Sequence, residues 1–392
     1  MRIFFITSKL NFTSAGGSIE EFDLIIRMLQ KWGHEVTVIT AFSKANDLTV
    51  SLPYTIIEEN ISARGLVGIQ YGIYQLLKKY AGQADLFHVD GHLFLYGAGL
   101  FRWLGGRVPV SAYFNREQPS WPELRSSLFS VSRSSLFKRL KRTMRWHIEK
   151  YFLMPIASQI DRMSFISPHF KIEYEKAGLK TAGKSVVVGD PIDLKKIRHE
   201  QGITERYYLK RNKRGGPFTI FYSSRMAPGK GFDVLLTGFS KVRNKSNFKL
   251  ILGGSGPEEQ YVKQMIHNLK LEPYVELPGW VDKEKLFAYH HEADIFIQAD
   301  WLPYGTSISL LYALTFCLPC IVFGDSGLEW IAGKAALYFP YRDSEALARQ
   351  IERLGASYQL REELARAAWR RLNDDDFNFE HQIRKMYAGM GI

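Results

Sequence analysis

Cysteine is nearly absent from this sequence, in which Cys317 and Cys320 are the only two among 392 residues. So few cysteines exclude a fold held together by disulfides, and they fit a reducing cytoplasm. The C-x-x-C spacing occurs in redox and zinc sites, but a zinc site needs further ligands and a redox thiol needs exposure at a helix start. Here the pair ends an apolar helical pattern and has no second pair to join. We therefore expect two buried structural thiols and no metal centre.

Long hydrophobic runs are also rare. The apolar start of the chain, residues 1–7, is too short for the core of a signal peptide. Residues 307–323 are rich in Leu and Ile, but Pro319 interrupts them where a helix has to stop. We interpret that segment as a buried helix followed by a buried strand. Repeats and low-complexity tracts are missing as well, and 46% hydrophobic with 23% charged residues indicates an ordinary globular protein.

Acidic residues are missing from residues 124–148, where the basic ones gather in a chain of net charge +12. Phe, Leu, Met and Trp side chains interleave there with seven cations: Arg125, Arg133, Lys138, Arg139, Lys141, Arg142 and Arg145. A basic amphipathic helix of this kind is typical of peripheral binding to an anionic membrane surface. A solvated helix at a domain edge is the alternative, and nucleic acid would also bind such a patch. Because no nucleic-acid module is recognisable, we predict no nucleic-acid partner. From the basic amphipathic segment we predict a cytoplasmic protein that binds the inner face of the plasma membrane.

Alternating strand and helix patterns, in contrast, are abundant. Residues 2–6 form an apolar strand pattern, and residues 36–39 form a second one. Between them Ser18 and Glu21 have the spacing of a capping box, ahead of a helical apolar stripe that ends at Gly33. Strand, helix and strand in this order make a βαβ unit, which implies a parallel sheet with right-handed crossovers.

This alternation occurs twice. It runs to a strand pattern at residues 185–188, is interrupted by the polar residues 195–216, and restarts with a strand pattern at residues 218–222. We therefore predict an α/β protein of two Rossmann-like domains with parallel sheets, residues 1–195 and 196–375. Two such domains in succession bind a ligand at the carboxyl ends of their strands, in a cleft that both face. A fold of this kind does not by itself name a reaction.

The most specific stretch for chemistry is residues 223–231, Ser-Ser-Arg-Met-Ala-Pro-Gly-Lys-Gly, a predicted loop between a strand and a helix. Arg225 offers a rigid fork for phosphate oxygens, and Lys230 offers a mobile positive charge at the start of the helix. The glycines let a ligand approach the backbone, and the helix amino end adds partial positive charge. The spacing matches neither a Walker loop nor a dinucleotide fingerprint. Two solvent-facing cations are the alternative interpretation of this stretch alone.

A second stretch, residues 303–309, opens an apolar helix pattern. Gly305, Thr306, Ser307 and Ile308 are suited to present backbone amides and hydroxyls to a diphosphate, and a plain helix cap explains them equally well. Taken together, the two stretches supply two cations and a helix amino terminus to one face of one domain. That combination favours a nucleotide diphosphate as the ligand.

The order of these motifs resembles that of the retaining glycosyltransferases of the GT-B fold, in the large family 4 (group 1 type). The resemblance runs along nearly the whole chain, and its motifs follow in the family's order and spacing. They are Gly16-Gly17, residues 31–36, residues 187–193, Arg225 with Lys230-Gly231, residues 254–257, residues 277–281, residues 293–297, residues 316–322 and residues 325–329. The resemblance also implies that a C-terminal helix, residues 376–392, packs back on the first domain.

The resemblance implies a site for a nucleotide-sugar donor of the UDP or GDP type. Arg225 and Lys230 would be catalytic, because they would bind the diphosphate and stabilise it as the leaving group. Gly16 and Gly17 would approach the phosphates from the other domain. The remaining donor residues are Gly254, Thr306, Ser307, Ile308, Trp280 and Val281. The last two of these would lie beside the nucleotide base.

The sequence also departs from the family pattern. Tyr304 and Tyr312 stand where the family has two glutamates, one for the donor sugar and one for the ribose. We expect Tyr312 to line the nucleotide pocket, with packing against the next strand as the alternative. Asn115 stands where a histidine is common, so it is the candidate catalytic residue of the first domain. The acceptor-side candidates are His88, Asp90 and His92, and we expect no metal and no bound cofactor.

These interpretations predict a glycosyltransferase that moves a sugar from a nucleotide-diphosphate donor to a hydroxyl of a saccharide acceptor. The resemblance implies a retaining, hexosyltransferase-like reaction. The basic segment favours a lipid-linked acceptor, as in the assembly of a cell-surface polysaccharide or glycan. The alternatives are a nucleotide-sugar epimerase, a catalytically inactive scaffold that would explain the two tyrosines, and a nucleic-acid-binding protein that would explain the charge of +12.

Overall fold

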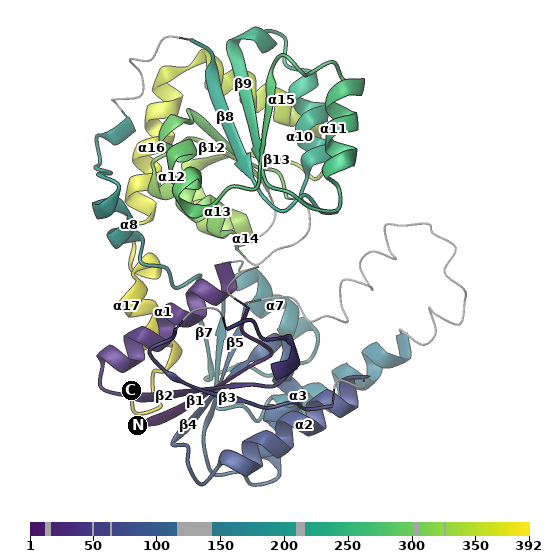
Figure 1. The fold of residues 1–392 in the computed structure, drawn as a ribbon, viewed down its shortest axis with the longest axis vertical. Helices are drawn as coiled ribbons and strands as arrows, with labels where there is room; N and C mark the ends of the chain where they lie inside the picture. The colour runs from purple at the N-terminus through teal and green to yellow at the C-terminus, as the bar shows by residue number, and fades with distance from the viewer. Residues whose placement is uncertain are drawn as a thin grey trace. The chain divides into compact units, whose positions relative to one another are not determined.

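The chain folds into two compact units in a computed structural model (Figure 1). The structure describes residues 1–11, 17–48, 51–62, 65–115, 143–208, 216–300, 306–324 and 327–392, with the side chains of residues 17–20 excepted. Unit 1 comprises Met1–Ile192 together with Phe379–Ile392, and unit 2 comprises Asp193–Asn378. The domain limits predicted from the sequence were residues 195 and 375.

Unit 1 contains a seven-stranded parallel sheet in the order β3-β2-β1-β4-β5-β6-β7. Its strands are β1 (Arg2–Thr7), β2 (Glu35–Thr40), β3 (Thr55–Glu58), β4 (Leu86–Asp90), β5 (Val110–Phe114), β6 (Arg162–Phe165) and β7 (Ser185–Val187). Every residue of β1 after Arg2 is buried, because helices cover both faces of a parallel sheet. The predicted opening strands at residues 2–6 and 36–39 are confirmed.

Helices lie on both sides of this sheet, with α1 and α17 on one side and α2 and α3 on the other (Figure 1). Their bounds are α1 (Gly17–Lys31), α2 (Gly65–Tyr80), α3 (Gly91–Trp103), α6 (Met154–Ala157), α7 (Pro168–Lys176) and α17 (Phe379–Met386), with a 3-10 turn at Ser43–Ala45 and a π-helical turn at Glu149–Leu153. Helix α1 begins at Gly17, one residue before the predicted N-cap residue Ser18, and the Ser18 side chain that the predicted capping box requires lies outside the described ones.

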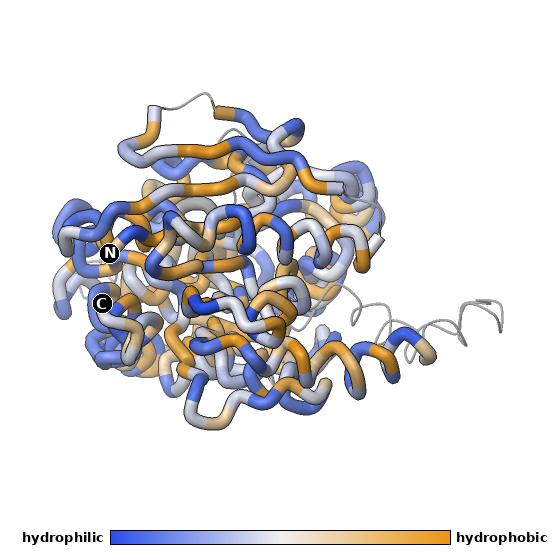
Figure 2. Tube along the Cα trace, turned by 90° about the horizontal axis from the view of Figure 1, so that it is seen from below, coloured by the Kyte–Doolittle hydropathy of each residue, from blue (hydrophilic) through white to orange (hydrophobic). Residues whose placement is uncertain are grey.

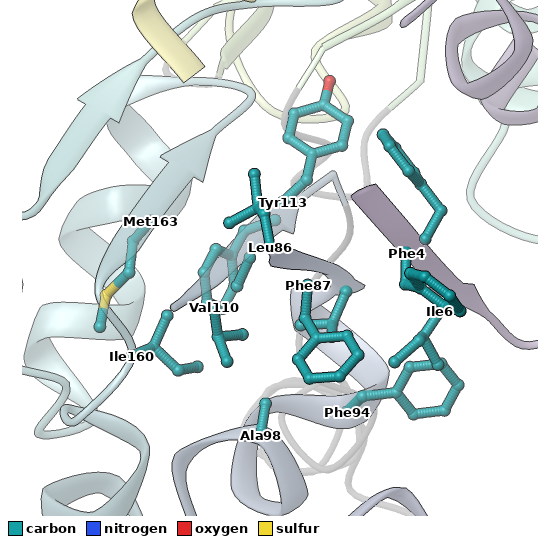
Figure 3. Packing of buried hydrophobic residues seen from close by; sticks show 14 of the residues in the cluster. Phe4, Ile6, Leu86, Phe87, Phe94, Ala98, Val110, Tyr113, Ile160 and Met163 are labelled. Carbon is teal, nitrogen blue, oxygen red and sulfur yellow. The ribbon is translucent and has the colours of Figure 1, made fainter. Parts of the chain in front are cut away.

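Apolar side chains fill the space between the unit 1 sheet and its helices. Figure 3 shows Phe87 and Phe94 packed among aliphatic residues such as Ala98, with the Tyr113 hydroxyl pointing away from the cluster. The rings of Phe87 and Phe101 meet edge to face at 5.7 Å. Figure 2 shows hydrophobic and hydrophilic residues alternating along the helices, as expected for helices that bury one side.

The C-terminal residues of the chain belong to unit 1. Helix α17 contacts α1 and β6, and Ile383 and Tyr387 are fully buried. The Tyr387 hydroxyl lies 2.9 Å from Nδ1 of His88, and the Arg162 guanidinium donates to the Lys385 carbonyl at 2.6 Å. Polar bonds as well as apolar packing therefore hold this segment to unit 1, although the whole of unit 2 separates it in sequence.

Unit 2 contains a six-stranded parallel sheet in the order β10-β9-β8-β11-β12-β13. Its strands are β8 (Phe218–Ser223), β9 (Phe248–Gly253), β10 (Val275–Gly279), β11 (Ile295–Gln298), β12 (Cys320–Phe323) and β13 (Ala336–Phe339). Its helices are α8 (Leu194–Glu200), α10 (Phe232–Ser240), α11 (Glu259–Asn268), α12 (Lys283–Glu292), α13 (Ile308–Thr315), α14 (Gly327–Ala332), α15 (Ser344–Ala356) and α16 (Tyr358–Arg371), with 3-10 turns at Lys245–Asn247, Gly333–Ala335 and Asp375–Phe377. Figure 1 shows α10, α11 and α15 on one side of this sheet, and α12, α13 and α16 on the other.

The apolar segment at residues 307–323 is a helix followed by a strand, as predicted, because α13 and β12 occupy it on either side of Pro319. Cys317 and Cys320 are fully buried, and burial raises the pKa of the Cys320 thiol. Within the part of the chain that the structure describes, no helix is both long enough and apolar enough to cross a lipid bilayer.

Candidate functional site

Most of the predicted donor residues lie at one edge of the unit 2 sheet. Because the strands are parallel, β8, β9, β10 and β11 all end at this edge, which we call the carboxyl edge. The loop with Lys230 follows β8, Gly254 follows β9, and Trp280 with Val281 follows β10. The amide of Gly254 donates to the carbonyl of Gly279 at 2.7 Å. The structure thus brings together residues that are far apart in the sequence.

Two of these loops are packed backbone to backbone. The Met226 amide donates to the Ser255 carbonyl at 2.9 Å, and the Ser224 amide donates to the Gly253 carbonyl at 3.2 Å. Gly254 has a φ of +121°, and a Cβ atom at this position would clash with the carbonyl oxygen of Ser224. Glycine is therefore required here by the close approach of the two loops as well as by its own backbone angle.

Arg225 projects from the packed loop into solvent. Its side chain is exposed, while the next residue, Met226, is buried and anchors the loop. Arg225 forms no ion pair with another residue of the described ranges. Because this guanidinium has no counter-ion among the described residues, it is available to an anionic ligand.

Lys230 is not a solvent-facing cation, because it forms an ion pair with Asp300. Its Nζ lies 2.9 Å from Oδ2 of Asp300, and the two side chains are 23% and 5% exposed. Asp300 comes two residues after β11, at the carboxyl edge. Asp300 is not among the site residues predicted from the sequence. Its position just past a buried strand was the signal that pointed to this edge.

The hydroxyl of Tyr222 contacts both Lys230 and Asp300. This side chain is fully buried, and its hydroxyl lies 2.7 Å from the Lys230 carbonyl oxygen and also contacts Oδ1 of Asp300. Burial raises the pKa of the Asp300 carboxyl, against the lowering by Lys230, Tyr222 and Gln298. The ammonium of Lys230 and the carboxylate of Asp300 thus share a partly desolvated environment in which their charges interact strongly.

The amino end of α13 lies at the same edge. Ser307 caps the helix by accepting from the Leu310 amide at 3.3 Å, and its hydroxyl donates to Gln298 Oε1 at 3.1 Å. The helix-cap interpretation of Ser307 is therefore confirmed. Thr306 and Ile308 beside it are half-buried. Tyr304 and Gly305 lie outside the described residues.

The other predicted donor residues differ in exposure. Trp280 is 66% exposed, while Val281 is half-buried with a methyl group against Gly253. Tyr312 is only 4% exposed, and its ring meets that of Phe287 edge to face at 5.3 Å. Core packing of the Tyr312 ring is thus observed, and the contact of its hydroxyl with a nucleotide stays a prediction.

In unit 1, Asp90 and Asn115 lie at the carboxyl ends of two adjacent strands. Asp90 ends β4 and accepts from the Thr7 hydroxyl at 2.8 Å. Asn115 directly follows β5 and is half-buried. His92 is 7% exposed within α3. Gly17 begins α1, and Gly16 lies outside the described residues.

His88 is a core residue. It lies inside β4, with its ring stacked on Phe5 at 4.4 Å and hydrogen-bonded to the hydroxyl of Tyr387. Burial lowers its pKa from 6.5 to about 3, so the imidazole is neutral at physiological pH. We leave His88 out of the acceptor site, because its partners are parts of the core.

A buried polar group that the sequence did not indicate surrounds Tyr113. The hydroxyl lies 3.1 Å from the Gly189 carbonyl oxygen and 3.3 Å from a carboxylate oxygen of Glu21. Glu21 and Asp190 are 3% and 5% exposed. Burial, together with these two carboxylates, raises the pKa of Tyr113 well above its usual value. Glu21 therefore faces the end of β5, although its spacing to Ser18 had predicted a capping role.

Comparison with known proteins identifies unit 2. Residues 205–371 match the family described as glycosyl transferases group 1. Unit 2 is a glycosyl transferase group 1 domain. Among related proteins, the amylovoran biosynthesis glycosyltransferase AmsD of Erwinia amylovora is 27% identical over 162 residues, 41% of this chain and 44% of AmsD. The GDP-mannose-dependent alpha-(1-6)-phosphatidylinositol monomannoside mannosyltransferase of Mycobacterium tuberculosis is 24% identical over 150 residues, 38% of each chain.

The glycosyltransferase resemblance of the sequence is thereby confirmed, although the matches span less than half the length of these relatives. The fold extends over the whole chain. The crystal structure of HepE from Anabaena in complex with UDP-glucose superposes with a TM-score of 0.70, at 16% identity and over 98% of both chains. The chain has the GT-B glycosyltransferase fold, as predicted. Its relatives act in the biosynthesis of polysaccharides and glycolipids.

Proposed function

We propose that this glycosyltransferase moves a sugar from a nucleoside-diphosphate donor of the UDP or GDP type to a hydroxyl of a saccharide acceptor. The observation that carries the proposal is the convergence of Arg225, Lys230 and the amino end of α13 at the carboxyl edge of unit 2. Two cations and a helix amino terminus together suit the two phosphates of such a donor. The complex of HepE with UDP-glucose supports the choice of a nucleotide sugar.

In the proposed reaction the glycosidic bond to the diphosphate breaks and negative charge develops on the leaving phosphate. Arg225 and Lys230 stabilise that charge, which is the main contribution such a site makes to the rate. Trp280 offers an exposed ring to the nucleotide base. Asn115 and Asp90 bind the acceptor from unit 1. We propose a retaining course, in which the leaving phosphate accepts the proton of the incoming hydroxyl.

Thermal-shift measurements with UDP, GDP and ADP test the donor class. We expect one of them to raise the melting temperature, because a ligand present at 100 times its Kd stabilises a protein by about 2.7 kcal/mol. Transfer of radiolabelled sugar from the matching nucleotide sugar should then require an added saccharide acceptor. Conversion of the nucleotide sugar without an acceptor would indicate an epimerase, and binding without any turnover would indicate an inactive scaffold.

We further propose that the acceptor is lipid-linked and that unit 1 binds peripherally to an anionic membrane. Residues 124–142 of the basic segment lie outside the described residues, but its continuation carries exposed apolar side chains. Met144, Ile148, Tyr151 and Phe152 are 58%, 43%, 60% and 68% exposed. Their spacing places them along one side of a helix. The nearby Lys150 has its Nζ 4.7 Å from the Trp146 ring.

Sedimentation with liposomes tests this membrane proposal. We expect the protein to pellet with vesicles that contain anionic lipid at low salt and to be released at high salt, because each cation near such a surface contributes about 1 kcal/mol. Replacing Phe152 with serine should weaken the binding, since its apolar burial in the interface is lost. The control is Tyr261→Ser, which removes a 51% exposed aromatic side chain from unit 2. Equal recovery in the supernatant under all conditions would favour a soluble acceptor.

A further inference from the structure

We propose that Asp300 sets how tightly the carboxyl edge of unit 2 holds a nucleoside diphosphate, and that its negative charge favours release of this product over release of the donor. The inference rests on the proposed function, and it assigns a role in specificity to Asp300, which was not among the predicted site residues. It starts from the ion pair between Lys230 and Asp300, which a phosphate group has to share or break.

The contacts of the two partners show which of them is able to move. Asp300 is 3% exposed, and the buried Tyr222 hydroxyl contacts its carboxylate. Lys230 carries its charge on a flexible stem and is 23% exposed at the side chain. An incoming phosphate therefore competes with a fixed carboxylate for a mobile ammonium. Part of the attraction between the ligand and Lys230 is offset by Asp300.

Competition from Asp300 lowers the affinity for the product more than the affinity for the donor. In a nucleotide sugar the terminal phosphate is esterified to the sugar. Transfer breaks the bond between the sugar carbon and the phosphate oxygen, whose electron pair stays on the diphosphate. The acceptor oxygen forms a new bond to that carbon, and its proton passes to the leaving phosphate. The nucleoside diphosphate thus has an additional ionisable oxygen on its terminal phosphate. It loses the accepted proton to solvent in most molecules at neutral pH, because the second pKa of a phosphate is about 6. Like charges at short range in a partly desolvated site repel strongly, so Asp300 destabilises the bound product more than the bound donor.

The surroundings of Asp300 support a role beyond structure. Asp300 pairs with Lys230, the lysine of the loop that resembles the family's phosphate-binding loop. Arg225 on the same loop has no such partner within the described residues, so the site retains one cation that attracts phosphate without competition. Within the described residues, the site thus has one cation, Arg225, that attracts phosphate at full strength, and a second, Lys230, whose attraction for phosphate is reduced by Asp300.

Calorimetric titration of Asp300→Asn with UDP and UDP-glucose, and with GDP and GDP-mannose, tests the proposal. Asparagine keeps the shape and removes the charge. We expect the nucleoside diphosphate to bind roughly tenfold more tightly than to the wild type, and the nucleotide sugar to gain less. Steady-state transfer should show stronger inhibition by the product. Asp300→Ser, also neutral and able to hydrogen-bond, serves the same test if the asparagine variant does not fold.

The matched control is Asp294→Asn. Asp294 lies just before β11, at the opposite end of the strand from Asp300, and accepts from the Thr219 amide at 2.9 Å. The Asp294→Asn substitution removes one negative charge from unit 2, as Asp300→Asn does, but leaves the partner of Lys230 in place. The affinities for the nucleoside diphosphate and for the nucleotide sugar should therefore stay unchanged. Equal or weaker binding of the nucleoside diphosphate to Asp300→Asn overturns the inference and makes Asp300 a residue that only positions Lys230. A wild-type protein that binds none of the four compounds overturns the proposed function itself, and the inference with it.

Discussion

Replacing Gly254 with alanine is expected to destabilise unit 2 by about 2–6 kcal/mol, the sum of a strained backbone and a steric clash of about 1–3 kcal/mol each. Gly254 has a φ of +121°, and its added methyl group would meet the Ser224 carbonyl. Relief of the clash requires the loop with Arg225 to move, so affinity for the nucleoside diphosphate should fall as well. Urea unfolding followed by circular dichroism measures the first effect, and calorimetry measures the second.

Gly279→Ala separates the clash from the backbone angle. Gly279 has a φ of +76°, and no atom lies within 4 Å of an added Cβ. Its replacement should therefore cost only about 1–2 kcal/mol, the price of a left-handed conformation. The two glycines are joined by the bond from the Gly254 amide to the Gly279 carbonyl, so both variants probe the same edge. Equal losses of stability in the two variants would show that the close approach of the loops contributes nothing.

Loss of either candidate phosphate-binding cation should strongly weaken binding of the nucleoside diphosphate. For Arg225→Ala we expect a loss of about 1.5–3 kcal/mol, the usual value of a hydrogen bond to a charged group, or roughly 10- to 150-fold in Kd. Stability should not change, because Arg225 is exposed. Arg243→Ala is the control, since it removes an 88% exposed guanidinium from the same unit. Unchanged affinity in the Arg225 variant would remove this residue from the donor site.

Lys230→Ala should weaken binding in the same range but also lower stability, because it leaves the buried Asp300 carboxylate without its counter-ion. Burial raises the pKa of Asp300, and the loss of Lys230 removes an interaction that lowers it. The cost should therefore be small at acidic pH, where Asp300 is protonated, and grow as the pH rises through its folded-state pKa. The double variant Lys230→Ala/Asp300→Asn should recover much of the stability and remove this pH dependence.

The parts of the fold that follow from local patterns were predictable. Strands buried on both faces read as continuous apolar runs, as in β1, and the interruption at Pro319 separates α13 from β12. The motifs of the donor loops were recognisable because each is short and contiguous. The ends of elements were less certain, since the predicted N-cap residue of α1 lies inside the helix.

The partners of the site residues could not be predicted, because they are distant in the sequence. Lys230 and Asp300 are 70 positions apart, and Glu21 and Tyr113 are 92 positions apart. Local spacing assigned Glu21 to a helix cap, whereas the sheet order brings it to the end of β5. Whether a carboxylate is buried depends on which strands are neighbours in the sheet. Local sequence spacing does not reveal the order of the strands, so it could not predict these contacts.

The path of the chain also bears on how the protein is made. Unit 2 is one continuous segment, Asp193–Asn378, whereas unit 1 is completed by Phe379–Ile392. During synthesis the ribosome therefore delivers all of unit 2 before α17 is available to cover its site on α1 and β6. Until then Ile383 and Tyr387 are absent from the core of unit 1, and the partner of His88 is missing. Until residues 379–392 have been synthesised, the part of unit 1 that α17 covers in the folded protein stays exposed to solvent.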